Sequence, residues 1–168
     1  VLFPRENTND LDYFFIEKAL QAVTSGDASF RIDAQDVSAF SKAKLESYQV
    51  VILNDGATKL NTADFERLKL FVKQGGLIVA APAERAALLF SKMKAYGLAD
   101  ISFKSMVRRK NSSDLPFNFT QMAENSELLK IFKNTPDSDL QNFAIYRYNS
   151  YKTGQDARHV LRIKPDTP

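Results

Sequence analysis

The sequence predicts an α/β fold with a mostly parallel sheet, and three observations support this prediction. Apolar, strand-like runs alternate with amphipathic helical stretches over the first hundred or so residues. Val50–Leu53 is a run of β-branched and aliphatic residues, which is typical of a strand buried on both faces. Strands that alternate with helices form parallel sheets with right-handed crossovers. We therefore expect a flavodoxin-like three-layer sandwich, with helices on both faces of the sheet and extra antiparallel strands in the C-terminal part.

Residues 1–44 are expected to form two strands, one helix and a polar segment. Asp10 is an N-cap residue in front of a stretch whose apolar side chains fall on one helical face. A polar stretch later separates the weak second strand from the strong one at Val50–Leu53. The expected order is a strand at residues 1–3, a loop at 4–9, a helix at 10–23, a strand at 28–32 and a polar segment at 33–44.

The clearest helix start in the chain lies at Asn61. Asn61 is a favourable N-cap, and Asp64 at the third helical position completes a capping box. Gly75 suits the left-handed conformation that commonly ends a helix. The side chains expected to face the core are Phe65, Leu68 and Val72.

The rest of the chain is expected to contain one more strand and helix up to Gly97, followed by less regular elements. Residues 77–81 are expected to form another strand buried on both faces, followed by a helix at 83–96 that Gly97 ends. Residues 101–109 alternate at period two, as a strand does. Further expectations are a loop at 111–119, a short helix at 126–132, a turn at 135–139 and strands at 143–148 and 159–164.

Length and composition indicate one soluble domain spanning residues 1–168. The chain opens inside a strand-like run, so we expect a domain excised from a longer polypeptide. Its apolar runs are too short for a membrane span. The net charge of +3 is too small to predict a nucleic-acid partner.

Several chemistries lack the residues they need. The chain has no Cys, which excludes disulfides, thiolate nucleophiles and Cys-based metal sites. His159 is the single histidine, and no G-x-S-x-G elbow accompanies it. Asp27, Asp33 and Asp36 lack the spacing of a calcium loop, and no nucleotide-binding glycine motif occurs. We therefore predict no catalytic residues, no metal site and no cofactor.

Polar residues nevertheless follow three of the expected parallel strands. Ligands of doubly wound sheets bind outside the carboxyl ends of the strands. The residues expected to converge there as a ligand-binding cluster are Arg5, Glu6, Asn54, Asp55 and Glu84.

Two stretches carry a family resemblance. Residues 48–54 (YQVVILN), then Leu60, and residues 70–79 (LFVKQGGLIV) resemble class I glutamine amidotransferase-like domains, especially degenerate ones. Such domains include ThuA-like proteins and trimerisation domains of some β-galactosidases. The closest likeness is to domains of bacterial BatA-type membrane proteins linked to aerotolerance, and it covers residues 1–96.

The resemblance implies a fold whose active site has been lost. Active members of the class place a Cys on the turn after the strand, whereas residues 80–84 here are AAPAE. Pro82 also lacks the N–H that an oxyanion hole would use. By resemblance, the chain is a non-catalytic binding or scaffolding domain of a membrane-anchored envelope protein. Its expected location is periplasmic or membrane-associated, with cytoplasm not excluded. Its expected partners are other domains of the same chain or envelope proteins, with the membrane reached through regions outside this segment.

Two alternatives remain open at this point. Asp55 and Glu84, with Arg5, would suit a hydrolase or transferase if their environments split the two carboxyl pKa values. The basic segment at residues 108–110 (RRK) would instead suit the binding of an anionic ligand or surface.

Overall fold

The computed structural model describes residues 1–5, 14, 17–18, 31–82, 84–109, 115–122, 144–158 and 160–163. Contacts within the chain define two compact units, Val1–Phe103 and Lys104–Pro168, and each is considered by itself. The first unit combines a parallel sheet with helices, and the second contains antiparallel strands. The described residues therefore belong to the α/β class.

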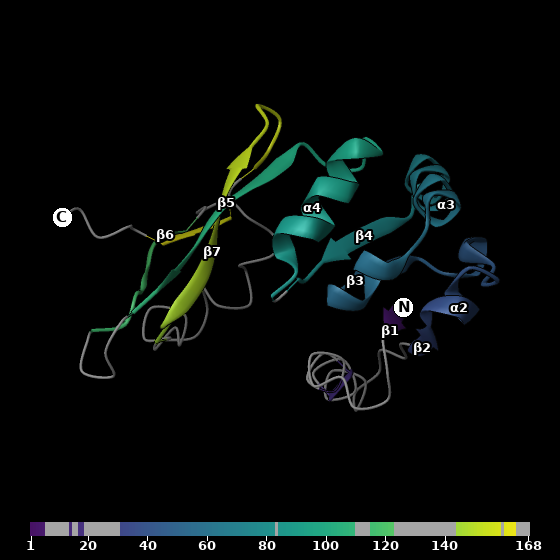
Figure 1. Ribbon diagram of the computed structural model, residues 1–168, viewed down its shortest axis with the longest axis horizontal. Coiled ribbons are helices and arrows are strands. Elements are labelled where there is room, and N and C mark those ends of the chain that lie inside the picture. The colour runs from purple at the N-terminus through teal and green to yellow at the C-terminus, as the bar shows by residue number, and fades with distance from the viewer. Residues whose placement is uncertain are drawn as a thin grey trace. The chain divides into compact units, whose positions relative to one another are not determined.

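A four-stranded parallel sheet forms the centre of the first unit (Figure 1). Its strands are β1 (Leu2–Arg5), β2 (Asp33–Asp36), β3 (Val50–Leu53) and β4 (Leu77–Ala80), in the order β2-β1-β3-β4. All three pairings are parallel, and β3 meets β4 in an unbroken register from Val50↔Leu77 to Leu53↔Ala80. The predicted parallel sheet is thereby confirmed, with its core at Val51, Ile52 and Leu53.

The first strand runs further than predicted, through Pro4 and Arg5. Proline has no N–H to donate, so it normally interrupts a central strand. Asp33 N donates to Val1 O, so alternation along β1 directs the nitrogen of Pro4 toward β3. The register on that side consists of Leu2↔Val51 alone. The N–H that Pro4 lacks would therefore point to β3 beyond the last residue pair that the two strands form, so no hydrogen bond of the sheet is lost.

The second strand was placed too early. Arg31 and Ile32 are not in a strand, and β2 lies at Asp33–Asp36, inside the segment predicted to be polar and irregular. Its sequence, DAQD, has low strand propensity. Pairing with β1 at four positions overrides that propensity, and β2 leads directly into α2 (Val37–Phe40). Of the helix predicted at residues 10–23, only Phe14, Glu17 and Lys18 are described, and these three are helical.

The helix α3 (Thr62–Lys73) begins as the sequence predicts. Asn61 Oδ1 accepts from Asp64 N at 3.0 Å, and Asn61 N donates to Asp64 Oδ2 at 3.2 Å, which completes the capping box. The predicted inward position of Val72 is wrong, because Phe71 is buried and Val72 is 42% exposed.

Two glycines connect α3 to β4 for different reasons. Gly75 has a φ of +94°, the left-handed conformation that the sequence predicts for it. A Cβ atom on Gly76 would lie 2.2 Å from the ring of Phe71, so the chain can pass this ring only without a side chain.

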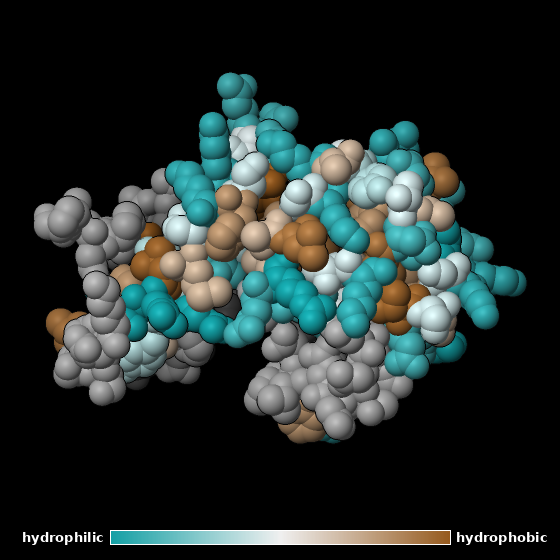
Figure 2. All heavy atoms as spheres, viewed as in Figure 1, coloured by the Kyte–Doolittle hydropathy of each residue, from teal (hydrophilic) through white to brown (hydrophobic). Residues whose placement is uncertain are grey.

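The prediction that β4 is buried on both faces is wrong. Leu77 is 56% exposed and Val79 is 41% exposed, whereas Ile78 and Ala80 on the opposite face are half-buried. β4 is an edge strand of its sheet, so an apolar run here does not require cover on both sides. Figure 2 shows hydrophobic residues, in brown, reaching the surface among hydrophilic ones in teal.

The helix α4 (Ala86–Ala95) packs against η2, a 3₁₀ helix at Asp55–Lys59. Lys92 Nζ donates to the carbonyl oxygens of Thr58 at 2.6 Å and Leu60 at 3.1 Å. The rings of Phe65 and Tyr96 stack with centroids 5.0 Å apart. The predicted end of this helix is confirmed by Gly97, whose φ is +67°.

The second unit contains antiparallel strands, as the sequence predicts for the C-terminal part, but the strand at Phe119–Met122 was not predicted. β6 (Phe119–Met122) pairs antiparallel with β8 (Leu161–Ile163), with an irregularity between Phe119 and Gln121. β5 (Ile101–Arg108), which begins in the first unit, pairs with β7 (Arg147–Thr153). β7 starts later than predicted, after an isolated bridge between Phe117 and Ile145. The helix predicted at 126–132, the turn at 135–139 and His159 lie outside the described residues.

Candidate functional site

The cluster predicted at the carboxyl ends of the strands is described in part. Arg5 ends β1, but its side chain, like the whole of Glu6, lies outside the described residues. Asn54 directly follows β3, Asp55 begins η2, and Glu84 lies between β4 and α4. The structure therefore describes three of the five predicted residues in full.

Asn54 has a local structural role. Its side chain is fully buried, and Oδ1 accepts a hydrogen bond from Gly56 N at 3.2 Å, which caps η2. Within the described part of the chain, its buried Nδ2 atom has no hydrogen-bond partner. Asn54 thus shapes the turn out of β3 from inside the core.

Asp55 binds the main chain at the start of α4. Its Oδ2 atom accepts hydrogen bonds from Glu84 N at 2.9 Å and Arg85 N at 3.0 Å. These N–H groups precede the first helical residue, Ala86, where a helix N-terminus attracts negative charge. The chain therefore places its own carboxylate where an external anion or oxyanion would otherwise bind.

The same junction lacks a reactive group. Ala80, Ala81 and Pro82 carry no hydroxyl, thiol or amine. The side chain of Glu84 is exposed, and only the main-chain nitrogen of this residue is held by Asp55. Asp55 therefore contacts the backbone of Glu84, and this hydrogen bond links the segment after β3 to the start of α4.

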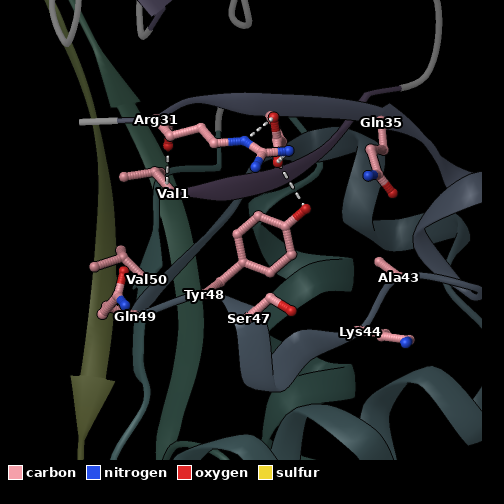
Figure 3. A pocket seen from close by; sticks show the side chains of 10 residues that line it. Val1, Arg31, Gln35, Ala43, Lys44, Ser47, Tyr48, Gln49 and Val50 are labelled. Atoms are coloured by element: carbon pink, nitrogen blue, oxygen red, sulfur yellow. Dashed lines mark hydrogen bonds and ion pairs between the residues drawn. The ribbon is translucent and has the colours of Figure 1, made fainter. Parts of the chain in front are cut away.

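A hollow of about 570 Å³ opens at the opposite, amino end of the sheet. Figure 3 shows its lining, which comes from the start of β2 and β3 and from the loop around η1 (Leu45–Ser47). We call it the Tyr48 pocket, and the side chains that define it are Arg31, Asp33, Gln35, Lys44, Ser47 and Tyr48.

One side of the Tyr48 pocket is a closed polar network. The Tyr48 hydroxyl donates to Asp33 Oδ2 at 2.8 Å, and Arg31 Nη2 lies 3.2 Å from the same oxygen (Figure 3). The hydrogen bond from Tyr48, followed by the hydrogen bond and the charge of Arg31, lowers the pKa of Asp33 below its ordinary value. Burial and the bond to Asp33 raise the pKa of Tyr48. Asp33 is therefore a carboxylate and Tyr48 a neutral phenol at neutral pH.

The other side of the pocket offers polar groups that the chain does not use. Among the described residues, the side chains of Gln35, Lys44 and Ser47 make no hydrogen bond or ion pair. Gln35 is half-buried on β2, and in Figure 3 its amide lies on the side of the pocket that carries Ala43. A ligand at these groups would displace no contact among the described side chains.

The loop at Ala43, which forms one side of the Tyr48 pocket, is stabilised by hydrogen bonds from Arg67 of α3. Arg67 Nη1 donates to the carbonyl oxygens of Phe40 at 3.2 Å and Ser41 at 2.7 Å, and Arg67 Nη2 donates to that of Ala43. Arg67 also lies beside the buried carboxylate of Asp64. One side chain of α3 thus fixes the loop that carries Lys44.

Sequence reasoning missed the Tyr48 pocket. The sequence predicts a polar segment at residues 33–44, and its candidate ligand sites are the carboxyl ends of the strands and the basic residues 108–110. The available signal was weak: a tyrosine two residues before a buried strand, and polar residues that alternate on β2. Their proximity depends on the pairing of β2 with β1.

The described residues provide neither a metal site nor a membrane-spanning helix. The described residues contain no group of three or more His, Cys, Asp or Glu side chains positioned to hold a metal ion. Within the same residues, no helix has both the length and the apolar character needed to cross a bilayer.

Known proteins provide no family for this chain. No protein-family model, curated protein or solved structure matches it. The likeness to amidotransferase-like domains therefore remains a prediction that rests on residues 48–54, Leu60 and residues 70–79.

Proposed function

We propose that this chain is a non-catalytic binding or scaffolding domain with a degenerate amidotransferase-like fold. The observation that carries the proposal is the double hydrogen bond from Glu84 N and Arg85 N to Asp55. It uses up the N–H groups that would stabilise an anionic intermediate, beside a turn without a nucleophile. In this proposal, the turn between β4 and α4 stabilises the fold, and ligands or partners bind at other surfaces of the domain.

The same proposal includes the arrangement of the strands and helices as a flavodoxin-like sandwich. The strand order β2-β1-β3-β4 agrees with the first four strands of the flavodoxin-like order, 2-1-3-4-5. The helices α3 and α4 follow β3 and β4 in the chain, as crossover helices do. Both facts support a flavodoxin-like three-layer sandwich.

The proposed setting is a membrane-anchored bacterial envelope protein, in the periplasm or at the membrane. The support for this setting is the resemblance of residues 1–96 to BatA-type domains. The exposed side chains of Leu77 and Val79 on edge strand β4 favour a protein partner, such as another domain of the same polypeptide.

A catalytic role for Asp55, Glu84 and Arg5 has less support. A general acid or base must reach the substrate, whereas Asp55 Oδ2 already accepts two main-chain hydrogen bonds. The proposal and this rival differ in what Asp55 contributes to stability, because residues kept for chemistry commonly cost stability.

The test is the stability of the Asp55→Asn variant, measured by urea unfolding. Asparagine keeps an acceptor oxygen but lacks the charge that strengthens the two hydrogen bonds at this half-buried position, so the free energy of unfolding should fall by about 1–2 kcal/mol. Glu66→Gln removes the same charge from an exposed site on α3 and should change stability by less than about 0.5 kcal/mol. An Asp55→Asn variant as stable as the unaltered chain, or more stable, would contradict the proposal and favour the catalytic rival.

A further inference from the structure

We propose that the Tyr48 pocket binds a small planar molecule that carries a carboxylate. The inference rests on the proposed binding role and gives that role a site and a ligand class. The pocket lies at the amino end of the parallel strands, away from the Asp55 junction. At about 570 Å³, its volume falls inside the range of roughly 300–1,000 Å³ that is usual for small-molecule sites.

The flat surface of the pocket is the Tyr48 ring. Its hydroxyl is fixed by the 2.8 Å hydrogen bond to Asp33, and Asp33 is held in turn by Arg31. A ring anchored at its far end can offer a face to an incoming ring without first losing rotational freedom. The neighbouring side chains of Ala43 and Val50 add apolar surface. A planar ligand is therefore favoured over a bulky aliphatic one.

The polar groups of the pocket suit a ligand with hydrogen-bonding atoms. Gln35 offers both an amide donor and a carbonyl acceptor, and the Ser47 hydroxyl offers the same pair. Neither side chain has a hydrogen-bond partner within the described part of the chain. Binding replaces water at these groups and breaks no protein contact.

The charges of the pocket select an anion. Arg31 and Lys44 are cations, and Asp33 is the one carboxylate among the described lining residues. The charge of Asp33 is already offset by Arg31 and by the Tyr48 hydroxyl. Lys44 is exposed and forms no ion pair among the described residues, so its ammonium is available to a ligand carboxylate. A cationic ligand would face two like charges.

The test is an NMR titration of the 168-residue chain with three flat probes of equal shape and different charge. Benzoate is the anion, benzamide the neutral analogue and benzamidinium the cation. Benzoate should shift the backbone amides of Gln35, Ser47 and Tyr48, with a dissociation constant on the order of 1–10 mM for so small a molecule. Benzamide should bind about threefold more weakly, and benzamidinium more weakly still.

A matched pair of variants assigns the charge effect to one residue. Lys44→Gln should weaken benzoate binding by about threefold and remove its advantage over benzamide. Lys42→Gln removes an exposed charge two positions away, outside the pocket lining, and should leave benzoate binding unchanged.

Three results would overturn the inference. They are equal affinity for benzamide and benzoate, no amide shifts at about 20 mM probe, or shifts at Asp55, Glu84 and Arg85 in place of the pocket. The last result would also restore the strand-end cluster as a ligand site. Failure of the probes alone would leave the non-catalytic role standing, since that role is tested by the stability of Asp55→Asn.

Discussion

The two ends of one parallel sheet handle their polar groups in opposite ways. At the carboxyl end, the Asp55 carboxylate and the N–H groups of Glu84 and Arg85 satisfy one another. At the amino end, the side chains of Gln35, Lys44 and Ser47 surround a hollow and have no partner in the described chain. The strand-end rule for α/β folds states where a ligand site usually forms. A ligand site therefore also needs polar groups that folding has not already used.

The largest expected effect comes from Arg67, which holds the pocket wall from outside. Arg67→Met removes three main-chain hydrogen bonds and leaves the buried Asp64 carboxylate without its cation. The free energy of unfolding should fall by about 2–3 kcal/mol. Benzoate binding should weaken too, although Arg67 does not line the pocket, because Ala43 and Lys44 lose their support.

Urea unfolding and the benzoate titration measure these two effects. Lys69→Met is the control, because it removes a charge from the same helix without touching the pocket loop. If Arg67→Met lowers stability but leaves benzoate affinity intact, the amino end does not depend on α3 for its shape.

An intermediate, pH-dependent effect is expected at Tyr48. Tyr48→Phe removes the hydrogen bond to Asp33 and should lower the free energy of unfolding by about 1 kcal/mol at neutral pH. The folded pKa of Asp33 is lowered, so its contribution is present above the ordinary value of 3.8 and is lost as pH falls through the folded value. The folded pKa of Tyr48 is raised, so its contribution is present below 10.0 and is lost as pH rises through the folded value.

Unfolding of both proteins from about pH 3 to about pH 11 measures this dependence. The stability difference between them should be largest between the two limits and shrink toward both. A difference that stays constant across the range would mean that the Asp33–Tyr48 bond does not stabilise the amino end.

The smallest stability effect is expected at Gln35, where it sharpens the contrast with Asp55. Gln35→Leu replaces a half-buried side chain that has no partner in the described chain, so stability should change by less than about 0.5 kcal/mol or increase. Benzoate binding should nevertheless weaken measurably. A stability loss above about 1 kcal/mol would instead make Gln35 a structural residue, as Asp55 is proposed to be.

Local sequence signals predicted the elements that depend on neighbours in the chain. The Asn61–Asp64 capping box, the left-handed Gly75 and the strand at Val50–Leu53 were all recognisable because their partners are close in sequence or their burial is complete. β2 was misplaced because its stability comes from β1, some thirty residues earlier, and not from its own DAQD sequence. The exposure of Leu77 and Val79 was missed because an apolar run looks alike in a central strand and an edge strand.

The candidate sites depend even more on distant pairs. Asp55 and Glu84 were predicted to lie near each other, and their segments do meet, but nothing in the residue pattern indicates that a main-chain nitrogen makes the contact. Arg31, Asp33 and Tyr48 come together only after β2 and β3 have both paired with β1. A pocket assembled in this way leaves no motif of adjacent residues.

The Asp55 contact also limits how this chain could acquire chemistry. A new thiol at Ala81 would lie in a turn whose adjacent N–H groups are already bound to a carboxylate. The nearby negative charge would raise the thiol pKa and keep it protonated. Removing Asp55 first would weaken the join between β3 and α4 before any activity existed. The route to a working nucleophile therefore passes through two dependent substitutions, neither of which brings a benefit alone, and such a barrier can keep a domain in a binding role over evolutionary time.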